Sequence, residues 1–245
     1  MNAPIITCFE RYEKKYFLNP GQLAAFTKSL APFVRADAYG QYTICNVYYD
    51  TDDYRLIRTS LEKPVYKEKL RVRSYGVPDT DGTVFVELKK KYDGVVYKRR
   101  ITAAPRTAQM LLRGIRPAGE QSQIQKEIEY FRRFHEVAPK VFIAYDRQAF
   151  QGVDNSALRI TFDRNMRYRL DRPDLLAGDD GLPILQSDDV LMEVKIPGTC
   201  PLWLSRLLSE HGIYPTSFSK YGECYNKHIL KANQTESRKE LTRSA

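Results

Sequence analysis

The sequence predicts an α+β protein in which an antiparallel sheet of about eight strands closes into a β-barrel tunnel, with helices packed outside it. Three observations lead to this fold class. The chain has 17 Tyr against one Trp and many short runs of Val, Ile and Phe, which favours strands. Most of the expected strands are joined by short turns, as at Asp93-Gly94, which favours antiparallel pairing. Several strands alternate an apolar face with a charged face, so that one face can pack on helices while the other lines the interior.

Length and charge limit the class of protein and of partner. The chain has 245 residues and a formal net charge of +9, and we expect one domain over 1–232 and a polar, frayed tail over 233–245. The basic balance favours an anionic partner, which is a nucleic acid, a membrane surface or a phosphate-rich small molecule. We see no signal peptide and no apolar run long enough to span a bilayer, so we expect a cytoplasmic protein without an integral membrane segment.

The cysteines do not predict a metal site. Cys8, Cys45, Cys200 and Cys224 lie far apart and form no Cys-x-x-Cys pair, so zinc is not expected. Free thiols in a reducing cytosol are the preferred interpretation.

In the first half of the chain, short helices are expected between strands. Asn19-Pro20 suits an N-cap followed by Pro at the first helical position, and Leu23, Phe26 and Leu30 form the apolar stripe of the helix that follows. We expect strands at 9–17, 43–50, 65–75, 83–91 and 95–101, and helices at 21–31 and 52–60.

In the second half, helices and strands are expected in separate groups. We expect helices at 106–113, 121–135, 201–211 and 220–231, and strands at 140–150, 157–168 and 190–196. Gly212 suits the C-cap of the third of these helices. The segment 171–189 is acidic and rich in Gly and Pro, which predicts a loop.

The strand over 65–75 carries an unusual run of positive charge. Lys67, Lys69, Arg71 and Arg73 occupy every second position, so all four lie on one face of a strand. Four like charges in a row repel one another, and stability alone would not select such an arrangement. A polyanion lying along that face would explain it.

The same division into apolar and charged faces recurs along other strands. The charged positions are Arg11, Glu13, Lys15, Glu87, Lys89, Lys91, Lys98, Arg100, Arg159, Asp163, Glu193 and Lys195. A sheet with one face in solvent would alternate in the same way, and for any single strand that interpretation is preferred. For the whole set of strands a solvent face is not the preferred interpretation. Solvent faces usually carry charges of both signs, whereas these positions are mostly Lys and Arg. A lumen lined with cations needs a bound anion, and phosphates suit it because Arg binds phosphate oxygens through two N–H groups while Lys acts as a point charge.

Four carboxylates share the charged faces, namely Glu13, Glu87, Asp163 and Glu193. For each of them, a salt bridge to a neighbouring cation explains the residue at least as well as a catalytic role. The alternative is that they hold a divalent metal, which takes hard oxygen ligands and bridges phosphates. Glu193 is the first candidate ligand, because it shares its face with Lys195.

A series of short segments adds a family resemblance. In order along the chain they are Glu13-Lys-Lys-Tyr, Val47-Tyr-Tyr-Asp, Leu70-Arg-Val-Arg-Ser-Tyr-Gly, Phe85-Val-Glu-Leu-Lys, Tyr145-Asp-Arg-Gln-Ala-Phe, Leu158-Arg-Ile-Thr-Phe-Asp, Leu191-Met-Glu-Val-Lys and Phe218-Ser-Lys-Tyr. Each is weak alone, but the ordered set is specific. The chain resembles the polyphosphate polymerase domain of the vacuolar transporter chaperone (VTC) family, which belongs to the triphosphate tunnel metalloenzyme, or CYTH-like, superfamily. The resemblance covers about Phe9 to Leu230, nearly the whole chain.

The resemblance implies roles for individual residues. Carried over by match, the residues that grip phosphate in catalysis are Arg71, Arg73, Lys89, Arg147, Arg159 and Lys220, and those that bind substrate are Lys15, Arg58, Tyr145 and Ser219. The other cations of the charged faces, Lys69, Lys91, Lys98, Arg100 and Lys195, are also expected to contact substrate. Glu193 would bind the metal, Mn²⁺ or Mg²⁺. One departure is Arg11, which stands where the superfamily often has a first Glu, and this weakens the case for a two-metal triphosphatase.

Three functions remain open on the sequence. The resemblance implies a polyphosphate polymerase, an enzyme that transfers the γ-phosphate of ATP to a growing polyphosphate chain, or to phosphate or pyrophosphate at initiation. The alternatives are a metal-dependent triphosphatase, which hydrolyses tripolyphosphate or nucleoside triphosphates, and a non-catalytic module that binds polyphosphate. A nucleic-acid partner is not expected. Proteins that bind nucleic acids tend to place exposed aromatic residues among lysines and arginines on an outer surface, whereas here the lysines and arginines alternate with core residues inside strands. A membrane partner that receives the product stays open.

Overall fold

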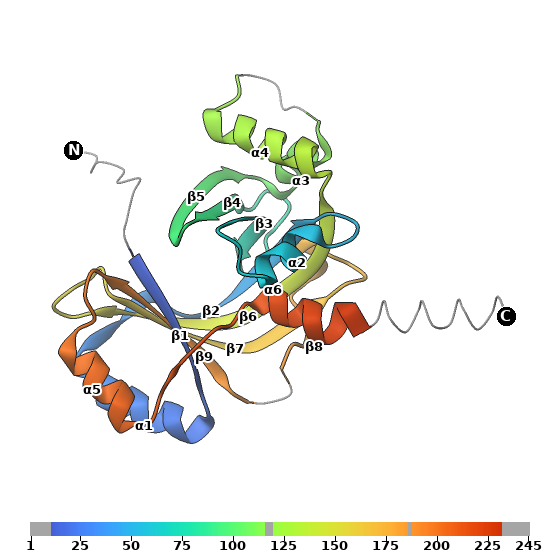
Figure 1. The fold of residues 1–245 in the computed structure, drawn as a ribbon. Helices are drawn as coiled ribbons and strands as arrows, with labels where there is room; N and C mark the ends of the chain where they lie inside the picture. Colours follow the sequence, from blue (N-terminus) through green and yellow to red (C-terminus); the bar gives the residue numbers. More distant parts are fainter. Residues whose placement is uncertain (1–10, 116–119, 186–187, 232–245) are drawn as a thin grey trace. The chain divides into compact units, whose positions relative to one another are not determined.

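The computed structural model describes residues 11–115, 120–185 and 188–231 (Figure 1). The first two residues of the expected strand 9–17, Cys8 and the expected tail over 233–245 lie outside these ranges. The described chain forms two compact units. The described residues of unit 1 are 11–43, 145–165, 185 and 188–217, and those of unit 2 are 44–115, 120–144, 166–184 and 218–231. The single domain expected over 1–232 stays a prediction.

The chain is α+β, with six α-helices and ten strands in the described residues. The strands are β1 (Arg11–Leu18), β2 (Val34–Asp50), β3 (Tyr66–Tyr75), β4 (Val84–Tyr92), β5 (Val95–Ala103), β6 (Ala138–Gly152), β7 (Arg159–Arg169), β8 (Leu182–Pro183), β9 (Val190–Pro197) and β10 (Pro215–Thr216). The helices are α1 (Pro20–Leu30), α2 (Arg55–Leu61), α3 (Pro105–Arg113), α4 (Gln123–His135), α5 (Leu202–Glu210) and α6 (Lys220–Cys224). Among the described helices, none is long and apolar enough to cross a bilayer.

The expected closed barrel is wrong. The strands form an antiparallel sheet whose hydrogen-bonded order is β10-β1-β9-β7-β6-β2-β3-β4-β5, with β8 added to β7. This path is open, since within the described residues its end strands β10 and β5 do not pair with each other. Closure requires the two edge strands to hydrogen-bond. Alternation along a strand sets which side chains share a face, but it carries no information on whether distant edges meet.

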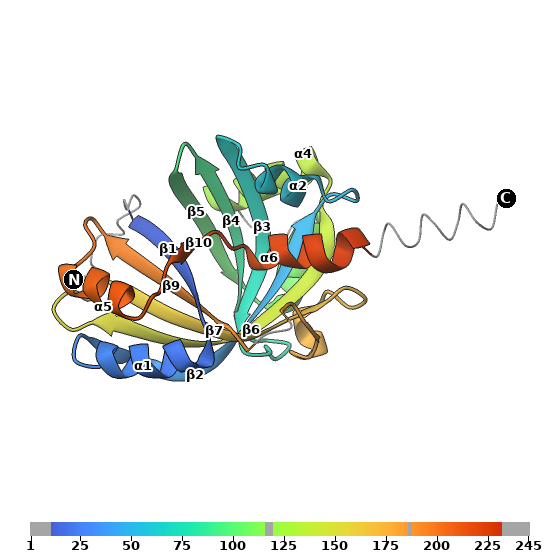
Figure 2. The same ribbon diagram turned by 60° about the horizontal axis from the view of Figure 1, so that its bottom comes forward.

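Unit 1 packs two helices on the apolar face of its strands. β1 pairs with β9 and β10, and β9 also pairs with β7 (Figure 2). α1 begins with a capping box in which the side chain of Asn19 accepts from Gln22 N, as the Asn-Pro signal predicts. Phe26 and Leu30 of α1 and Leu204 of α5 are buried against strand residues such as Phe162. α1 and α5 lie side by side in both views (Figures 1 and 2).

Unit 2 is built on the antiparallel meander β3–β4–β5, with β2 beside β3. Its core joins the apolar face of these strands to α3 and α4 (Figure 1). Leu70 and Leu88 are fully buried there against Leu111 and Phe131. The burial of each such side chain stabilises the folded state by roughly 1.5–3 kcal/mol. The predicted apolar face of the cationic strand is therefore confirmed, and its opposite face carries the charges.

Two element boundaries differ from the sequence prediction. β2 begins at Val34, well before the expected start at 43, because its first half is polar and exposed and lacks the apolar alternation that marks a strand. The last helix, expected as one element over 220–231, is α6 followed by a π-helical segment, Tyr225–Ile229. A π-turn is not visible in side-chain periodicity over so short a length.

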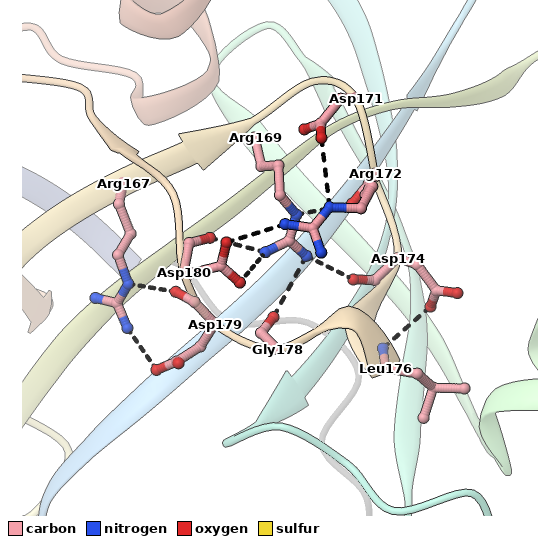
Figure 3. Close-up of polar contacts among 9 residues, drawn as sticks. All are labelled: Arg167, Arg169, Asp171, Arg172, Asp174, Leu176, Gly178, Asp179 and Asp180. Atoms are coloured by element: carbon pink, nitrogen blue, oxygen red, sulfur yellow. Dashed lines mark hydrogen bonds and ion pairs between the residues drawn. The ribbon is translucent and has the colours of Figure 1, made fainter.

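The part of the expected loop 171–189 that belongs to unit 2, residues 171–184, is held by arginines (Figure 3), and residues 186–187 lie outside the described ranges. It contains a short 3₁₀ helix, Leu175–Ala177, and strand β8. Arg169 is only 5% exposed and donates to the carbonyl oxygens of Arg172, Asp174, Gly178 and Asp180. A guanidinium offers five donors in a fixed plane, so one side chain fixes the course of a segment with few internal backbone bonds.

Candidate phosphate-binding faces

The charged face of unit 2 brings together the cations of three neighbouring strands. Strand register places Lys67 opposite Lys91, Lys69 opposite Lys89, and Lys89 opposite Lys98. Residues directly opposite each other in an antiparallel pair share a face and lie close together. Arg71 and Arg100 flank Glu87 on the same face. We call this set the cationic face, and its members are Lys67, Lys69, Arg71, Arg73, Glu87, Lys89, Lys91, Lys98 and Arg100.

Glu87 is the carboxylate at the centre of the cationic face. It is 2% exposed. Its Oε2 accepts from Arg71 Nε at 2.8 Å and lies 2.7 Å from Arg71 Nη2, while Oε1 lies 2.5 Å from Lys98 Nζ. Arg73 Nε is 4.0 Å from Oε2. These contacts favour a counter-ion role for Glu87, and its role as a metal ligand stays a prediction.

The pKa values of Glu87 and Lys98 show how strongly the charges on the cationic face act on one another. Burial acts to raise the pKa of Glu87, but the charges of Arg71, Arg73 and Lys98 outweigh it and lower the pKa to about 2. Burial lowers the pKa of Lys98 to about 8, although Glu87 acts in the opposite direction. Lys98 is therefore a cation that can lose its charge in mildly alkaline solution, whereas a guanidinium keeps it.

Two residues that carried no role in the sequence prediction hold the arginines in place. Arg73 Nε donates to Asn46 Oδ1 at 2.9 Å, and Asn46 is fully buried. Arg71 Nη1 donates to the hydroxyl of Tyr48 at 3.2 Å. Both partners come from β2, whose register puts Asn46 opposite Arg73 and Tyr48 opposite Arg71. The motif Val47-Tyr-Tyr-Asp pointed to this strand, but a sequence does not show which strand pairs with β3.

At the outer end of the cationic face, the register places two lysines opposite each other, Lys67 and Lys91, with Val96 of β5 beside Lys91. Lys67 Nζ donates to the carbonyl oxygen of Ser60, in the last turn of α2, at 3.1 Å. Burial and the neighbouring charges of Lys91, Lys89 and Lys63 lower the pKa of Lys67. Like charges held in this way are destabilising, so an anion at this end would relieve the repulsion.

The N-terminal turn of α6 carries Ser219 and Lys220. Ser219 is the N-cap of α6, and its Oγ accepts from Gly222 N at 3.2 Å. Lys69 Nζ donates to the same hydroxyl at 3.3 Å. Lys220 is 9% exposed. The structure thus brings three predicted substrate contacts together within unit 2, one from β3 and two from the start of α6.

The charged face of unit 1 is dominated by an ion-paired arginine. Arg147 of β6 is 8% exposed and forms a two-fold contact with Asp163, Nε to Oδ1 at 2.6 Å and Nη2 to Oδ2 at 2.7 Å. Nη2 also donates to Glu193 Oε2 at 3.2 Å. Burial acts to lower the pKa of Arg147, but Tyr145, Asp163 and Glu193 raise it. The guanidinium lies over the ring of Tyr145, 5.2 Å from its centroid.

Lys15 and Glu13 join the acidic end of this arrangement. Lys15 Nζ lies 3.7 Å from Glu13 Oε1 and 3.8 Å from Glu193 Oε1. Strand register places Lys195 opposite both Glu13 and Arg159. We call Lys15, Glu13, Arg147, Asp163 and Glu193 the acid-balanced cluster, because each cation in it faces a carboxylate.

Two further predicted phosphate ligands, Arg159 and Arg58, pair with aspartates outside these two sets. Arg159 is 3.8 Å from Asp37 through its Nη2, and its side chain is 43% exposed. Arg58, on α2, contacts the carbonyl and carboxylate of Asp53 at 3.2 and 3.3 Å. Both keep their predicted roles only as expectations.

The carboxylates suit one particular mode of metal binding. Among the described residues, no three His, Cys, Asp or Glu side chains gather to hold a metal ion by themselves. Mg²⁺ is usually held by one or two carboxylates together with substrate phosphates. Both oxygens of Asp163 hydrogen-bond to Arg147, and the two oxygens of Glu193 face Arg147 and Lys15, so Glu193 and Glu13 stay predicted metal ligands.

Solved structures share the fold at low sequence identity. Two putative adenylate cyclases align over most of this chain. The one from Bacillus halodurans has a TM-score of 0.52 and 13% identity over 87% of this chain and 96% of its own. The one from Hippeastrum, described as having a dominant triphosphatase activity, has a TM-score of 0.50 and 17% identity over 85% of this chain and 92% of its own.

A curated relative and a family model define the family. Subunit 4 of the vacuolar transporter chaperone complex from Schizosaccharomyces pombe is 26% identical over 87% of this chain. The match spans only 36% of that protein's length. The family model of the VTC domain matches residues 10–229. The chain therefore belongs to the VTC domain family.

Proposed function

We propose that this protein is an ATP-dependent polyphosphate polymerase. The observation that carries the proposal is the cationic face of unit 2, whose members are eight basic side chains and one carboxylate, Glu87. Placing lysines opposite lysines costs stability, so the face is built for a polyanion. Membership of the VTC domain family supports polyphosphate as that polyanion.

The side chains of the cationic face are suited to a triphosphate. Arg71 and Arg73 are already oriented by Tyr48 and Asn46, so little side-chain entropy is lost when they bind phosphate oxygens. Their planar guanidinium groups can each donate two parallel bonds to one phosphate. Lys98 and the outer lysines provide point charges along the remaining chain.

The reaction requires positioning and charge neutralisation more than covalent chemistry by the protein. An oxygen of the acceptor phosphate attacks the γ-phosphorus of ATP, the bond from that phosphorus to the β,γ-bridging oxygen breaks, and ADP leaves with the electron pair. The negative charge spreads over the transferred group in the transition state, where fixed cations stabilise it. No protein nucleophile takes part in this scheme.

The divalent metal is proposed to be Mn²⁺ or Mg²⁺, with Glu193 as its protein ligand. When bound, the metal would supply positive charge that neutralises the phosphates. In unit 1 Glu193 accepts from Arg147 and lies near Lys15, and these contacts orient its carboxylate. Glu13 is the second candidate oxygen donor.

The test is a product assay. The purified protein is incubated with ATP and Mn²⁺ or Mg²⁺, and phosphate chains are resolved on a gel while free phosphate is measured. Chains that lengthen with time support the polymerase. Free phosphate without chains would instead assign a triphosphatase, and the binding of polyphosphate without turnover would assign a non-catalytic module.

Matched variants connect the activity to the cationic face. Arg73→Gln removes a charge from this face, whereas Arg99→Gln removes one from the opposite side of β5, where Arg99 pairs with Glu127 at 3.6 Å. We expect polymerase activity to fall about 100-fold or more in Arg73→Gln, as when other groups that stabilise transition-state charge are removed. In Arg99→Gln we expect only a small change in activity. Equal effects of the two variants would disconnect the activity from the face.

A further inference from the structure

Asp50 is a buried carboxylate that joins three segments of unit 2. It lies at the end of β2 and is 0% exposed. Its Oδ1 accepts from Thr51 N at 2.8 Å and Leu56 N at 2.9 Å, and its Oδ2 accepts from Ile57 N at 3.0 Å. Asp50 therefore fixes the start of α2, whose own N-cap residue makes no side-chain cap bond. The fourth strong donor is the hydroxyl of Tyr221, 2.8 Å from Oδ2.

Tyr221 connects this carboxylate to the cationic face. Its ring stacks on Tyr48, with centroids 4.8 Å apart and planes inclined by 26°. Tyr48 in turn accepts from Arg71. The pKa values of the two stacked tyrosines shift in opposite directions. Burial and Asp50 raise the pKa of Tyr221. Burial also acts to raise the pKa of Tyr48, but the charges of Arg71 and Arg73 outweigh it and lower this pKa. Tyr221 therefore remains a neutral donor to Asp50, and Tyr48 remains an acceptor for Arg71.

The residues just before Tyr221 are predicted phosphate ligands. Ser219 and Lys220 directly precede it, and Ser219 Oγ accepts from Lys69 at 3.3 Å. The charge of Lys220 also acts on Tyr48. α6 lies beside α2, the other element that Asp50 holds (Figures 1 and 2). A rotation or shift of the first turn of α6 would move Ser219 and Lys220 relative to Lys69 and Arg71.

We propose that Tyr221 is a positioning residue that, through its bond to Asp50, holds the Ser219–Lys220 turn beside the cationic face so that Lys220 is ready to bind a phosphate chain. This inference rests on the proposed function, because it assumes a phosphate ligand. It adds a residue that touches no phosphate and acts only through Lys220. The physical basis is preorganisation, since a buried lysine fixed before binding loses less side-chain entropy when the ligand arrives.

The test measures the binding of tripolyphosphate, without metal or turnover, by titration calorimetry. Tyr221→Phe removes one hydroxyl and keeps the ring on Tyr48. We expect its dissociation constant to rise about 3- to 10-fold, the range that corresponds to the net contribution of one hydrogen bond. Tyr225→Phe is the matched control, because Tyr225 follows one turn later, is 7% exposed, and contacts Tyr54 through its ring.

A double-mutant cycle separates positioning from general stabilisation. In a Lys220→Ala background, Tyr221→Phe should cause little further loss of affinity, because the group that it positions is gone. The same loss in both backgrounds, or an equal loss in Tyr225→Phe, would show a merely structural role and overturn the inference. Wild-type affinity in Tyr221→Phe would overturn it as well. A wild-type protein that does not bind tripolyphosphate would instead overturn the proposed function, and this inference with it.

Discussion

The charged faces of the two units are built on opposite electrostatic principles. In unit 1 each cation of the acid-balanced cluster faces a carboxylate, and Arg147 is held by Asp163 and Glu193. In unit 2 the cations outnumber Glu87, and lysines stand opposite lysines. Buried charges must be neutralised from some source. In the acid-balanced cluster the protein's own carboxylates supply the counter-charge, whereas on the cationic face we propose that a bound polyanion supplies much of it.

This comparison predicts that the two faces respond differently to the loss of a carboxylate. The largest effect is expected for Asp163→Asn, which removes the two-fold partner of a buried guanidinium. The free energy of unfolding should fall by about 3–5 kcal/mol, as for other broken buried pairs. Denaturant titration measures it, and added tripolyphosphate should restore little.

Asp171→Asn is the control for this first variant. Asp171 is 73% exposed and pairs with Arg172 at 3.3 Å, so its loss should cost about 1 kcal/mol or less. A similar cost for both variants would mean that Arg147 does not depend on Asp163.

In unit 2 the corresponding change is Glu87→Gln. It leaves Arg71 and Lys98 without their common acceptor, and we expect a loss of about 1–3 kcal/mol. Here tripolyphosphate should recover much of the loss, because it supplies the missing negative charge. Absence of recovery would contradict the distinction between the two faces.

The pH dependence of stability gives a second readout of the same variant. Because the pKa of Glu87 falls from 4.5 to about 2 on folding, its stabilising contribution is present above the unfolded value and is lost as the pH decreases towards 2. Glu87→Gln should flatten the stability curve in that range, as measured by denaturant titration at successive pH values.

A smaller effect is expected from the titration of Lys98. Its pKa of about 8 means that it is charged at pH 7 and largely neutral at pH 9.5. We expect the affinity for tripolyphosphate to fall several-fold more over this range in the wild type than in Lys98→Arg, because the guanidinium stays protonated. Calorimetry at both pH values gives the ratio for each protein, and equal ratios would exclude Lys98 as the titrating group.

The smallest effect is expected at the outer lysines. Lys91→Gln should weaken the binding of long polyphosphate about 2- to 3-fold while changing tripolyphosphate binding less, because a short chain does not reach this end of the face. Lys90→Gln removes the same charge one residue away, on the opposite face, where Lys90 pairs with Glu68 at 3.6 Å. If the two variants lose affinity equally, net charge and not position explains the effect.

The sequence by itself determined which side chains share a face. Alternation separated Lys69 and Arg71 from Leu70 and Val72, and the structure confirms that separation. It also located most helices and strands to within a few residues, since apolar periodicity and cap residues are local signals. The ordered motifs pointed to the family, which the family model confirms.

Only the tertiary structure decided which residue each side chain contacts. The register that puts Lys98 beside Glu87, and the bond between Asp50 and Tyr221, 171 residues apart in the chain, depend on strand pairing and helix packing that no local pattern encodes. The closed barrel was inferred from alternation, but closure is a property of the two edge strands, and in the described chain β5 and β10 do not pair. Periodicity fixes the direction in which a side chain points, whereas only long-range packing fixes what it meets.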